Sequence, residues 1–328
     1  MNIKDVAKLA GVSSATVSRY FNHGYVSDKN RRAIEKVIKE TGYRPSAQAK
    51  ILRTRKSKTI GLMIPRLDSA AMSAVVSGIL EEVNQRGYHV LIANSQNDAE
   101  RELEYIKELS SMQVDGLIML ATVYSEQLRE ALSHLKIPVV IIGQNFEGFY
   151  SIYHDDYHAT YDMTELVQNR GCQQIGYIGV FTKDQAVGEE RYRGFCDSLK
   201  AHGRAEMAGN YVIAGFRVEE GYAGALALLN SHPKLDAIVC ATDNIAVGAM
   251  QYLTESGKKI PDDIMVTGQG DSLISRVVSP PLTTIHYYYE ESGTYAARRL
   301  FSRMSEDSEK EEGSGLGKMF SYKIIERN

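Results

Sequence analysis

From Thr59 onward, short apolar runs alternate with longer stretches in which apolar residues recur at helical spacing. A first set of runs extends from TIGLMI to PVVIIG, and a second set with an equivalent plan begins near His158 and extends from QIGYIGV to IMVTG. Strands that alternate with helices in this way form parallel sheets covered by helices on both faces. We therefore predict an α/β core of two doubly wound parallel-sheet subdomains. Ligands are expected in the cleft between them, outside the carboxyl ends of the strands.

The first 44 residues predict a different structure, a small all-α head. A first helix places Val6, Leu9 and Ala10 at helical spacing. A second helical segment, Val12 to Asn22, follows after a tight turn, and a third helix begins after Ser27. The first two helices and their turn predict a helix-turn-helix.

The second helical segment presents an outward face that suits DNA. Ser13 can cap the helix, and Val17, Tyr20 and Phe21 form its inward stripe. A helix with short leading side chains can enter a major groove, where arginine can pair with a guanine edge and serine or threonine can bond bases or phosphates. The alternative is a solvated helix of an ordinary helical subdomain. The candidate DNA-binding residues of this segment are Ser13, Ser14, Ala15, Thr16, Arg19 and Asn22.

Positive charge is concentrated at the amino-terminal end of the chain. Residues 1–58 hold 14 lysines and arginines against 4 aspartates and glutamates, a net charge of +10. The other 270 residues hold 24 against 37, a net charge of −13. A basic segment on an acidic body is the electrostatic pattern of a protein that binds the phosphates of nucleic acid.

Three runs in this order resemble the lactose/galactose repressor family of bacterial transcription factors: IKDVAKLAGVSSATVSRYFN, ETGYRPSAQAKILR and KTIGLMIP. Weaker matches extend to YKIIER, so the resemblance covers nearly the whole chain. It implies a homodimer on palindromic operator DNA and a core that is similar to sugar-binding periplasmic proteins. We expect a head at 1–44, a hinge at 45–58 and a core at 59–328. The core subdomains are expected at 59–145 plus 288–305 and at 155–280 plus 318–328, with crossings near 144–155 and 280–289.

Residues 45–58 are basic, and Ser46 to Arg53 (SAQAKILR) can form a short helix, although such a segment is too short to be stable alone. Composition leaves a flexible basic linker as the alternative. The resemblance implies a hinge helix that orders in the minor groove when two subunits bind DNA. Leu52 would then be an apolar wedge that kinks the duplex. Ser46 and Lys50, two mild departures from the family pattern, complete the candidate DNA-binding set.

The resemblance also implies effector-binding residues. Arg191, in the R-Y-R-G-F run, matches an arginine that holds sugar hydroxyls or a carboxylate, and its alternative is a surface salt bridge. Phe216 matches a stacking aromatic and could instead fill the core. Asp243 matches a carboxylate beside the pocket and could instead cap a helix. Tyr289 matches a further aromatic of the cleft.

Several positions depart from the family pattern, which puts some anchors in doubt. Gly270 and Gly143 stand where the family often has ligand-binding aspartates, so Gln144, Gln269 or Asp271 would have to replace them. The usual N-P-F-F run is SAAM, so the cleft wall loses two aromatics, and we include Ser69 and Met72 among the candidate residues. The loss of two aromatics would widen the cleft, and a wider cleft suits a disaccharide or its phosphate. The run GQGD followed by PPLTTIH resembles the sucrose and oligosaccharide repressor branch and argues against a purine corepressor.

Other classes of function lack a sequence signature. The chain has no dinucleotide fingerprint, no P-loop, no H-E-x-x-H and no G-x-S-x-G, so we predict neither an enzyme nor a cofactor. Three isolated cysteines and scattered histidines suggest no disulfide framework and no metal site. A polar amino terminus and the lack of a long apolar stretch place the protein in the cytoplasm, without a membrane partner.

These observations lead to one hypothesis and two alternatives. The chain is predicted to be a transcriptional repressor of a sugar-utilisation operon that a sugar effector releases from its operator. The first alternative is a corepressor-activated regulator, in which the ligand tightens DNA binding. The second is a sugar-binding or sensing protein that has no operator specificity.

Overall fold

The computed structural model describes residues 1–22, 24–43, 56–305 and 317–327. It divides into two compact units, Met1–Ser57 and Lys58–Asn328. No helix in these described ranges is long and apolar enough to cross a membrane. Within the same ranges, no group of three His, Cys, Asp or Glu side chains could hold a metal ion.

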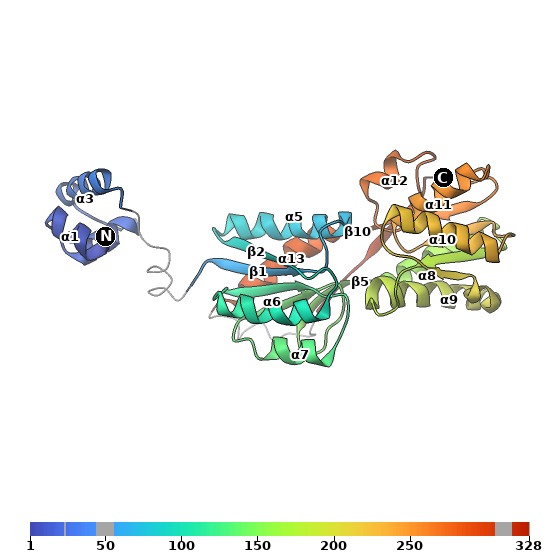
Figure 1. Ribbon diagram of the computed structural model, residues 1–328, viewed down its shortest axis with the longest axis horizontal. Coiled ribbons are helices and arrows are strands. Elements are labelled where there is room, and N and C mark those ends of the chain that lie inside the picture. The colour runs from blue at the N-terminus through green and yellow to red at the C-terminus, as the bar shows by residue number, and fades with distance from the viewer. Residues whose placement is uncertain (23, 44–55, 306–316, 328) are drawn as a thin grey trace. The chain divides into compact units, whose positions relative to one another are not determined.

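The first unit contains three helices, α1 (Ile3–Ala10), α2 (Ser14–Phe21) and α3 (Asp28–Thr41) (Figure 1). Asn2 and Asp5 form a capping box at the start of α1, and Gly11 ends this helix at φ 65°. The side chain of Ser13 accepts a bond from the Thr16 N–H and so caps α2, as predicted. These caps explain why the chain breaks into two short helices rather than one long helix.

The core of this unit consists of aliphatic side chains from all three helices. Val6, Val17 and Ile34 are completely buried. Of the apolar residues that lie at helical spacing in α1, Val6 is buried but Leu9 is 61% exposed, and Ala7 is buried as well. The helix-turn-helix head is confirmed.

The second unit begins with a parallel sheet of six strands in the order β11-β5-β4-β3-β1-β2. Helices α5 and α13 cover one face, and α6 and α7 cover the other (Figure 1). Because both faces are covered, the central strands read as continuous apolar runs. The elements are β1 (Thr59–Ile64), α5 (Ala70–Gln85), β2 (His89–Asn94), α6 (Ala99–Ser111), β3 (Gly116–Leu120), α7 (Glu126–Ser133), β4 (Val139–Ile142), β5 (Tyr150–His154), α13 (Tyr289–Arg303) and β11 (Gly317–Phe320).

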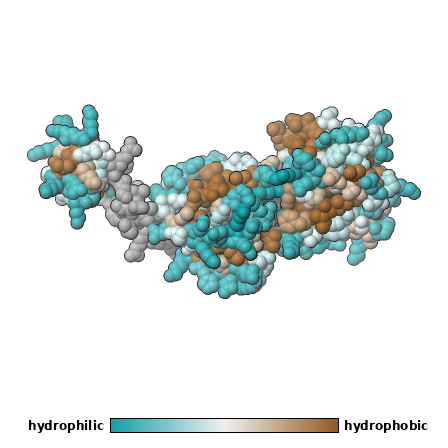
Figure 2. All heavy atoms as spheres, in the orientation of Figure 1, coloured by the Kyte–Doolittle hydropathy of each residue, from teal (hydrophilic) through white to brown (hydrophobic). Residues whose placement is uncertain are grey.

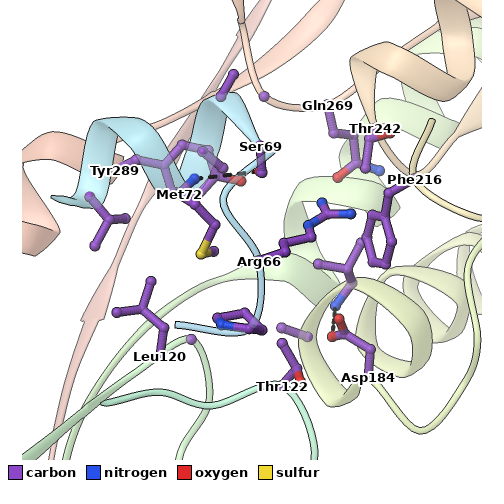
Figure 3. Close-up of a pocket in the computed structure, with 18 of the residues that line it drawn as sticks. Arg66, Ser69, Met72, Leu120, Thr122, Asp184, Phe216, Thr242, Gln269 and Tyr289 are labelled. Carbon is purple, nitrogen blue, oxygen red and sulfur yellow. Dashed lines mark hydrogen bonds between the residues drawn. The ribbon is translucent and has the colours of Figure 1, made fainter. Parts of the chain in front are cut away.

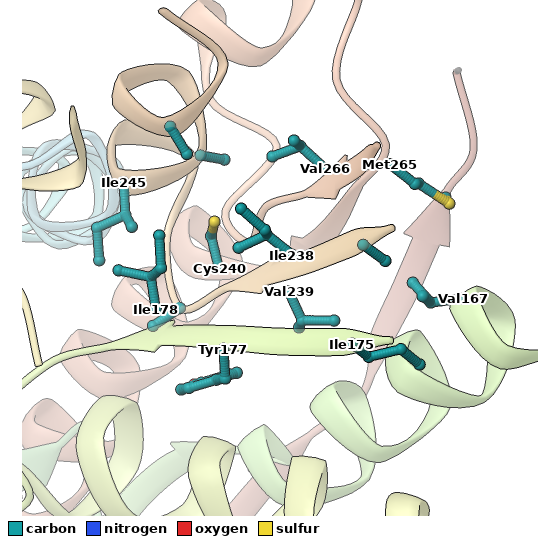
Figure 4. Packing of buried hydrophobic residues seen from close by; sticks show 14 of the residues in the cluster. Val167, Ile175, Tyr177, Ile178, Ile238, Val239, Cys240, Ile245, Met265 and Val266 are labelled. Atoms are coloured by element: carbon teal, nitrogen blue, oxygen red, sulfur yellow. The ribbon is translucent and has the colours of Figure 1, made fainter. Parts of the chain in front are cut away.

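The second half of this unit has a parallel sheet of four strands in the order β7-β6-β8-β9. Along β6 and β8, side chains alternate between the faces, so that Tyr177 lies on one side and Ile178 and Cys240 lie on the other (Figure 4). The elements are α8 (Asp156–Asn169), β6 (Ile175–Gly179), η1 (Gln185–Glu190), α9 (Arg191–Ala201), η2 (Ala205–Gly209), β7 (Tyr211–Ile213), α10 (Val218–Ser231), β8 (Ala237–Cys240), α11 (Asp243–Glu255), β9 (Met265–Thr267), α12 (Leu273–Val277), β10 (Thr284–Tyr287) and β12 (Tyr322–Ile325). The predicted core of two doubly wound halves is confirmed.

The chain passes between the halves at three places: from β5 to α8, from β10 to α13 and from β11 to β12. Two expectations need correction here. Residues 150–154 are a strand of the first sheet rather than part of a crossing, and residues 317–320 pair in parallel with β5 rather than joining the second half. The run MFSYKII reads as one strand, but Ser321 divides it, and β12 pairs antiparallel with β10. The spacing of apolar residues cannot predict this division, because β11 forms by pairing with the edge of β5, a strand that is distant in the sequence.

Two apolar surfaces of the second unit remain exposed. On α12, Leu273 is 74% and Val277 is 69% exposed, and apolar atoms gather over this helix in Figure 2. On the edge strand β2, Leu91 and Ile92 are exposed as well. Exposed apolar groups on a short helix and a sheet edge are typical of surfaces that bind another chain.

Candidate functional site

The orientation of α2 in the head is set by Val17, which is completely buried. With Val17 inward, the side chains of Ser14, Ala15, Arg19 and Asn22 are exposed, and Thr16 is half-buried. The hydroxyls of Ser13 and Thr16 lie 2.9 Å apart at the start of the helix. The structure therefore gathers the predicted recognition residues of this helix on one side of the head. The other candidate DNA-binding residues, Ser46, Lys50 and Leu52, lie outside the described residues.

A cavity lies between the two halves of the second unit, where the carboxyl ends of strands from both sheets meet. Its free volume, including its opening to solvent, is about 1110 Å³. The first half contributes the segments after β1, β3 and β4, and the second half contributes those after β6, β8 and β9. Figure 3 shows side chains from both halves projecting into the same space. This is the place that doubly wound folds offer a ligand.

Six of the seven candidate effector-binding residues line this cavity: Ser69, Met72, Arg191, Phe216, Asp243 and Tyr289. Asp271 does not, and its expected place in the cleft is wrong. Its carboxylate accepts bonds from Arg327, Arg276 and His286, which lower the pKa of this carboxyl against the effect of burial. These three side chains do not line the cavity either, so the Asp271 carboxylate is held by residues outside it.

Arg191 is buried and already paired inside the protein. Its Nη2 lies 2.6 Å from an Asp156 carboxylate oxygen, and its Nη1 donates a 2.5 Å bond to the Ala241 carbonyl. The hydroxyl of Tyr289 lies 3.5 Å from Nη2, and the guanidinium lies over the Tyr287 ring. The predicted alternative, a surface salt bridge, is wrong because the pair is buried. Most donors of Arg191 are occupied, so this residue orders the base of the cavity.

Asp243 lies at the first position of α11, whose cap is Thr242. Helix capping therefore does not explain Asp243. Its carboxylate accepts 2.7 Å bonds from the N–H and the hydroxyl of Ser272, and a 2.5 Å bond from the Thr284 hydroxyl. Burial raises the pKa of this carboxyl, while these bonds act in the opposite direction. Asp243 thus holds the loops after β9 and before β10 against the cavity.

Sequence reasoning missed three charged residues of the cavity: Asp156, which pairs with Arg191, and also Arg66 and Asp184. The guanidinium carbon of Arg66 lies 3.6 Å from the centroid of the Phe216 ring, across the cleft (Figure 3). Asp184 accepts a 2.9 Å bond from the Val187 N–H, and burial raises the pKa of its carboxyl to about 6. Arg66 and Asp184 follow sheet strands at their carboxyl ends, and that position is the signal that could have identified these two residues.

The two glutamines weighed as replacement anchors lie in different places. Gln269 lines the cavity, but the Tyr287 hydroxyl donates a 2.8 Å bond to its carbonyl and its amide donates a 3.0 Å bond to Thr160. Gln144 lines a second cavity, which shares residues with the first, and its buried amide has no partner among the described residues. His154 lines both cavities, its Nε2 has no partner within the same described set, and burial lowers its pKa.

Comparison with known proteins places this geometry in a family. The family model "Bacterial regulatory proteins, lacI family" matches residues 2–46, and a periplasmic binding protein-like domain matches residues 164–318. The sucrose operon repressor of Staphylococcus xylosus is 33% identical over 299 residues, which are 91% of this chain and 92% of that protein.

Two solved structures are similar over the whole chain. A lac repressor dimer bound to operator and to the anti-inducer ONPF has a TM-score of 0.87 at 24% identity and covers 100% of this chain and 98% of its own. A complex of the transcriptional regulator CelR with cellobiose has a TM-score of 0.75 at 25% identity. The match covers 100% of this chain and 99% of the CelR chain. The described part of the chain, its head and its two-half core agree with these matches. The protein therefore belongs to the lacI family of bacterial regulatory proteins and is a DNA-binding transcriptional regulator rather than an enzyme.

Proposed function

We propose that the protein represses a sugar-utilisation operon and that a sugar bound in the cavity releases it from its operator. The observation that carries this proposal is the cavity between two halves that are joined by three short crossings. A ligand that touches both halves binds one relative orientation of them better than another. It can therefore shift the equilibrium between a DNA-binding and a released state, by about 1 to 3 kcal/mol per linked site in typical cases.

The recognition residues of α2 support sequence-specific binding. Arg19 is exposed and lies on a helix whose neighbouring outward side chains are short. This arrangement allows the helix to approach base edges, and an arginine fork then discriminates guanine from other bases. The net charge of +10 on residues 1–58 adds affinity for phosphates without selecting a sequence.

A homodimer is the assembly that suits a palindromic operator, because each head then reads one half-site. The exposed apolar groups on α12 and β2 are the surfaces that we assign to the dimer contact. The similar lac repressor structure is described as a dimer bound to operator. Leu273 and Val277 lie one helical turn apart on α12, so a single partner surface can cover both.

A sugar of disaccharide size is the effector class that fits best. The run Ser69 to Met72 lacks the two aromatics that the family usually has there, and this loss supports a ligand larger than one ring. Phe216 and Tyr289 place aromatic rings in the cavity lining, and such rings stack well on the C–H side of a sugar. Among the similar proteins, one is named for sucrose and another is complexed with cellobiose.

The experiment is operator binding by the full chain, measured by fluorescence anisotropy on the palindrome upstream of its own or a neighbouring gene. The complex is titrated with sucrose, raffinose, maltose, trehalose and their phosphates. We expect one of them to release the DNA. A ligand that tightens the complex would identify a corepressor-activated regulator instead. Equal affinity for the palindrome and for a scrambled duplex would refute the proposal and favour a sugar sensor.

A further inference from the structure

Arg66 follows β1 directly after Pro65 and enters the cavity from the first half. Its guanidinium lies against Phe216, a residue of the second half, with 3.6 Å between the guanidinium carbon and the ring centroid. Figure 3 shows Arg66 between Phe216 and the first-half side chains Ser69 and Met72. The residue thus occupies the aromatic face on which a sugar ring would stack.

The donors of Arg66 are unused in the structure. Among the described residues, its guanidinium makes no hydrogen bond and no ion pair. Its contact with the aromatic face of Phe216 is a cation–π interaction. A guanidinium is a rigid fork of five donors that suits two oxygens of a carboxylate or a phosphate. A half-buried fork that no protein acceptor engages, in the lining of a cavity, is available to the oxygens of a ligand.

The acidic groups of the cavity do not fill this role. Asp156 is paired with Arg191, and Asp243 accepts bonds from Ser272 and Thr284. Asp184 accepts its bond from the Val187 N–H and acts on Arg66 only through space. Arg66 is therefore the one charged side chain among the described cavity residues whose hydrogen-bonding capacity is wholly free.

Asp68, Asp184 and Glu220 act on Arg66 through space, so an anion at this site must be stabilised by Arg66 itself and by the helix that starts beside it. The first turn of the 16-residue helix α5 begins beside it, and Ala70 and Ala71 of that turn line the cavity. Ser69 accepts a bond from the Met72 N–H and leaves the first two N–H groups of the helix to other acceptors. An anion beside a helix start is stabilised by these N–H groups and by the helix dipole.

We infer that the effector is an anionic sugar, a sugar phosphate or a sugar acid, whose charged group is bound by Arg66. This inference rests on the proposed function of the same cavity and adds the chemical class of the ligand. The anion draws the guanidinium off Phe216 into a charge-assisted, two-pronged bond, and the sugar ring then takes the vacated aromatic face. A neutral sugar offers Arg66 only neutral acceptors, so it competes poorly for Phe216.

The test is direct binding to the purified full chain by isothermal titration calorimetry, with pairs of sugars in which one member carries an added anionic group. The pairs are sucrose and sucrose 6-phosphate, trehalose and trehalose 6-phosphate, and galactose and galacturonate. We expect the anionic member of one pair to bind at least about tenfold more tightly. A preference in the phosphate pairs identifies a sugar phosphate, and a preference in the uronate pair identifies a sugar acid.

Variants assign the preference to Arg66. Arg66→Gln should remove it, and Arg66→Lys should keep a part of it. Arg217→Gln is the matched control, because Arg217 also carries positive charge at the cleft, near Asp68, but does not line the cavity. This control should keep the full preference.

Three results would overturn the inference: equal binding within every pair, a preference that survives in Arg66→Gln, or no binding of any anionic sugar. Operator binding of the same preparations separates this inference from the proposed function. Release of the operator by a neutral sugar alone would overturn the inference that the effector is anionic, and it would leave the proposed repressor function intact. Failure to bind the operator would instead overturn the proposed function.

Discussion

Asp184 gives the most direct test of how charge is balanced in the cavity. Its side chain is buried, and its carboxylate accepts the Val187 N–H at the start of η1. Burial raises the pKa of this carboxyl from 3.8 to about 6, while the Val187 bond and Arg191 oppose the rise. The charged form is therefore less stable in the folded protein than in the unfolded chain.

The sign and size of the effect follow from this shift. Between pH 4 and pH 6 the folded protein holds a proton on Asp184 that the unfolded chain has lost, so stability falls as the pH rises through this window. A rise of about two pKa units corresponds to about 3 kcal/mol, and this cost is complete above pH 6. Asp184→Asn removes the charge and keeps an oxygen that can accept the Val187 N–H.

We therefore expect Asp184→Asn to be more stable than the wild type at pH 7.5, by up to about 3 kcal/mol. Scanning calorimetry at several pH values measures this, with a rise in Tm of up to about 6 to 12 °C. The difference should vanish near pH 4, where the wild-type carboxyl is protonated. Asp98→Asn is the control, because Asp98 caps α6 with an exposed carboxylate and should show no such gain. An advantage that persists at pH 4, or none at pH 7.5, would refute the reasoning.

Three further predictions concern the head, the buried ion pair and the dimer contact. Arg19→Ala should relax base specificity, and an unchanged preference across a library of operator sites would contradict its assigned role. Asp156→Ala should destabilise the core by about 3 to 5 kcal/mol in urea unfolding, because it leaves the Arg191 guanidinium buried without a carboxylate. The double variant Asp156→Ala, Arg191→Met should lose less than the sum of the single variants, and additive losses would show that the pair is not coupled. Leu273→Glu should weaken self-association at least about tenfold in analytical ultracentrifugation, and an unaffected dimer would place the contact elsewhere.

Local features of the sequence predicted the head well. The caps at Asn2 and Ser13 and the glycine at position 11 each act on the backbone within three or four residues. Their effect depends on near neighbours, so the pattern alone was sufficient to predict α1 and α2. Helical spacing did not predict which apolar residue of α1 is buried, because spacing alone cannot rank Ala7 against Leu9 as the residue that packs in the core.

The cavity was predicted in position but only partly in content. Residues after strand ends were expected in the cleft because parallel strands share the direction of their carboxyl ends, and six of the seven candidates line it. Asp271 failed because its partner Arg327 is 56 residues away and the pairing forms only in the folded chain. Arg66 was missed because its place in the cavity depends on its contact with Phe216, which lies in the other half of the core.

By itself, the sequence determined the local elements: where helices begin and end, which runs are strands, and how charge is divided between head and core. These properties depend on spacing and on contacts between near neighbours. The tertiary structure decided what depends on distant segments meeting. It placed β11 beside β5, buried the pair of Arg191 and Asp156, and brought Arg66 against Phe216. The energy of each of these contacts depends on the burial and geometry of both partners, which only the folded chain supplies.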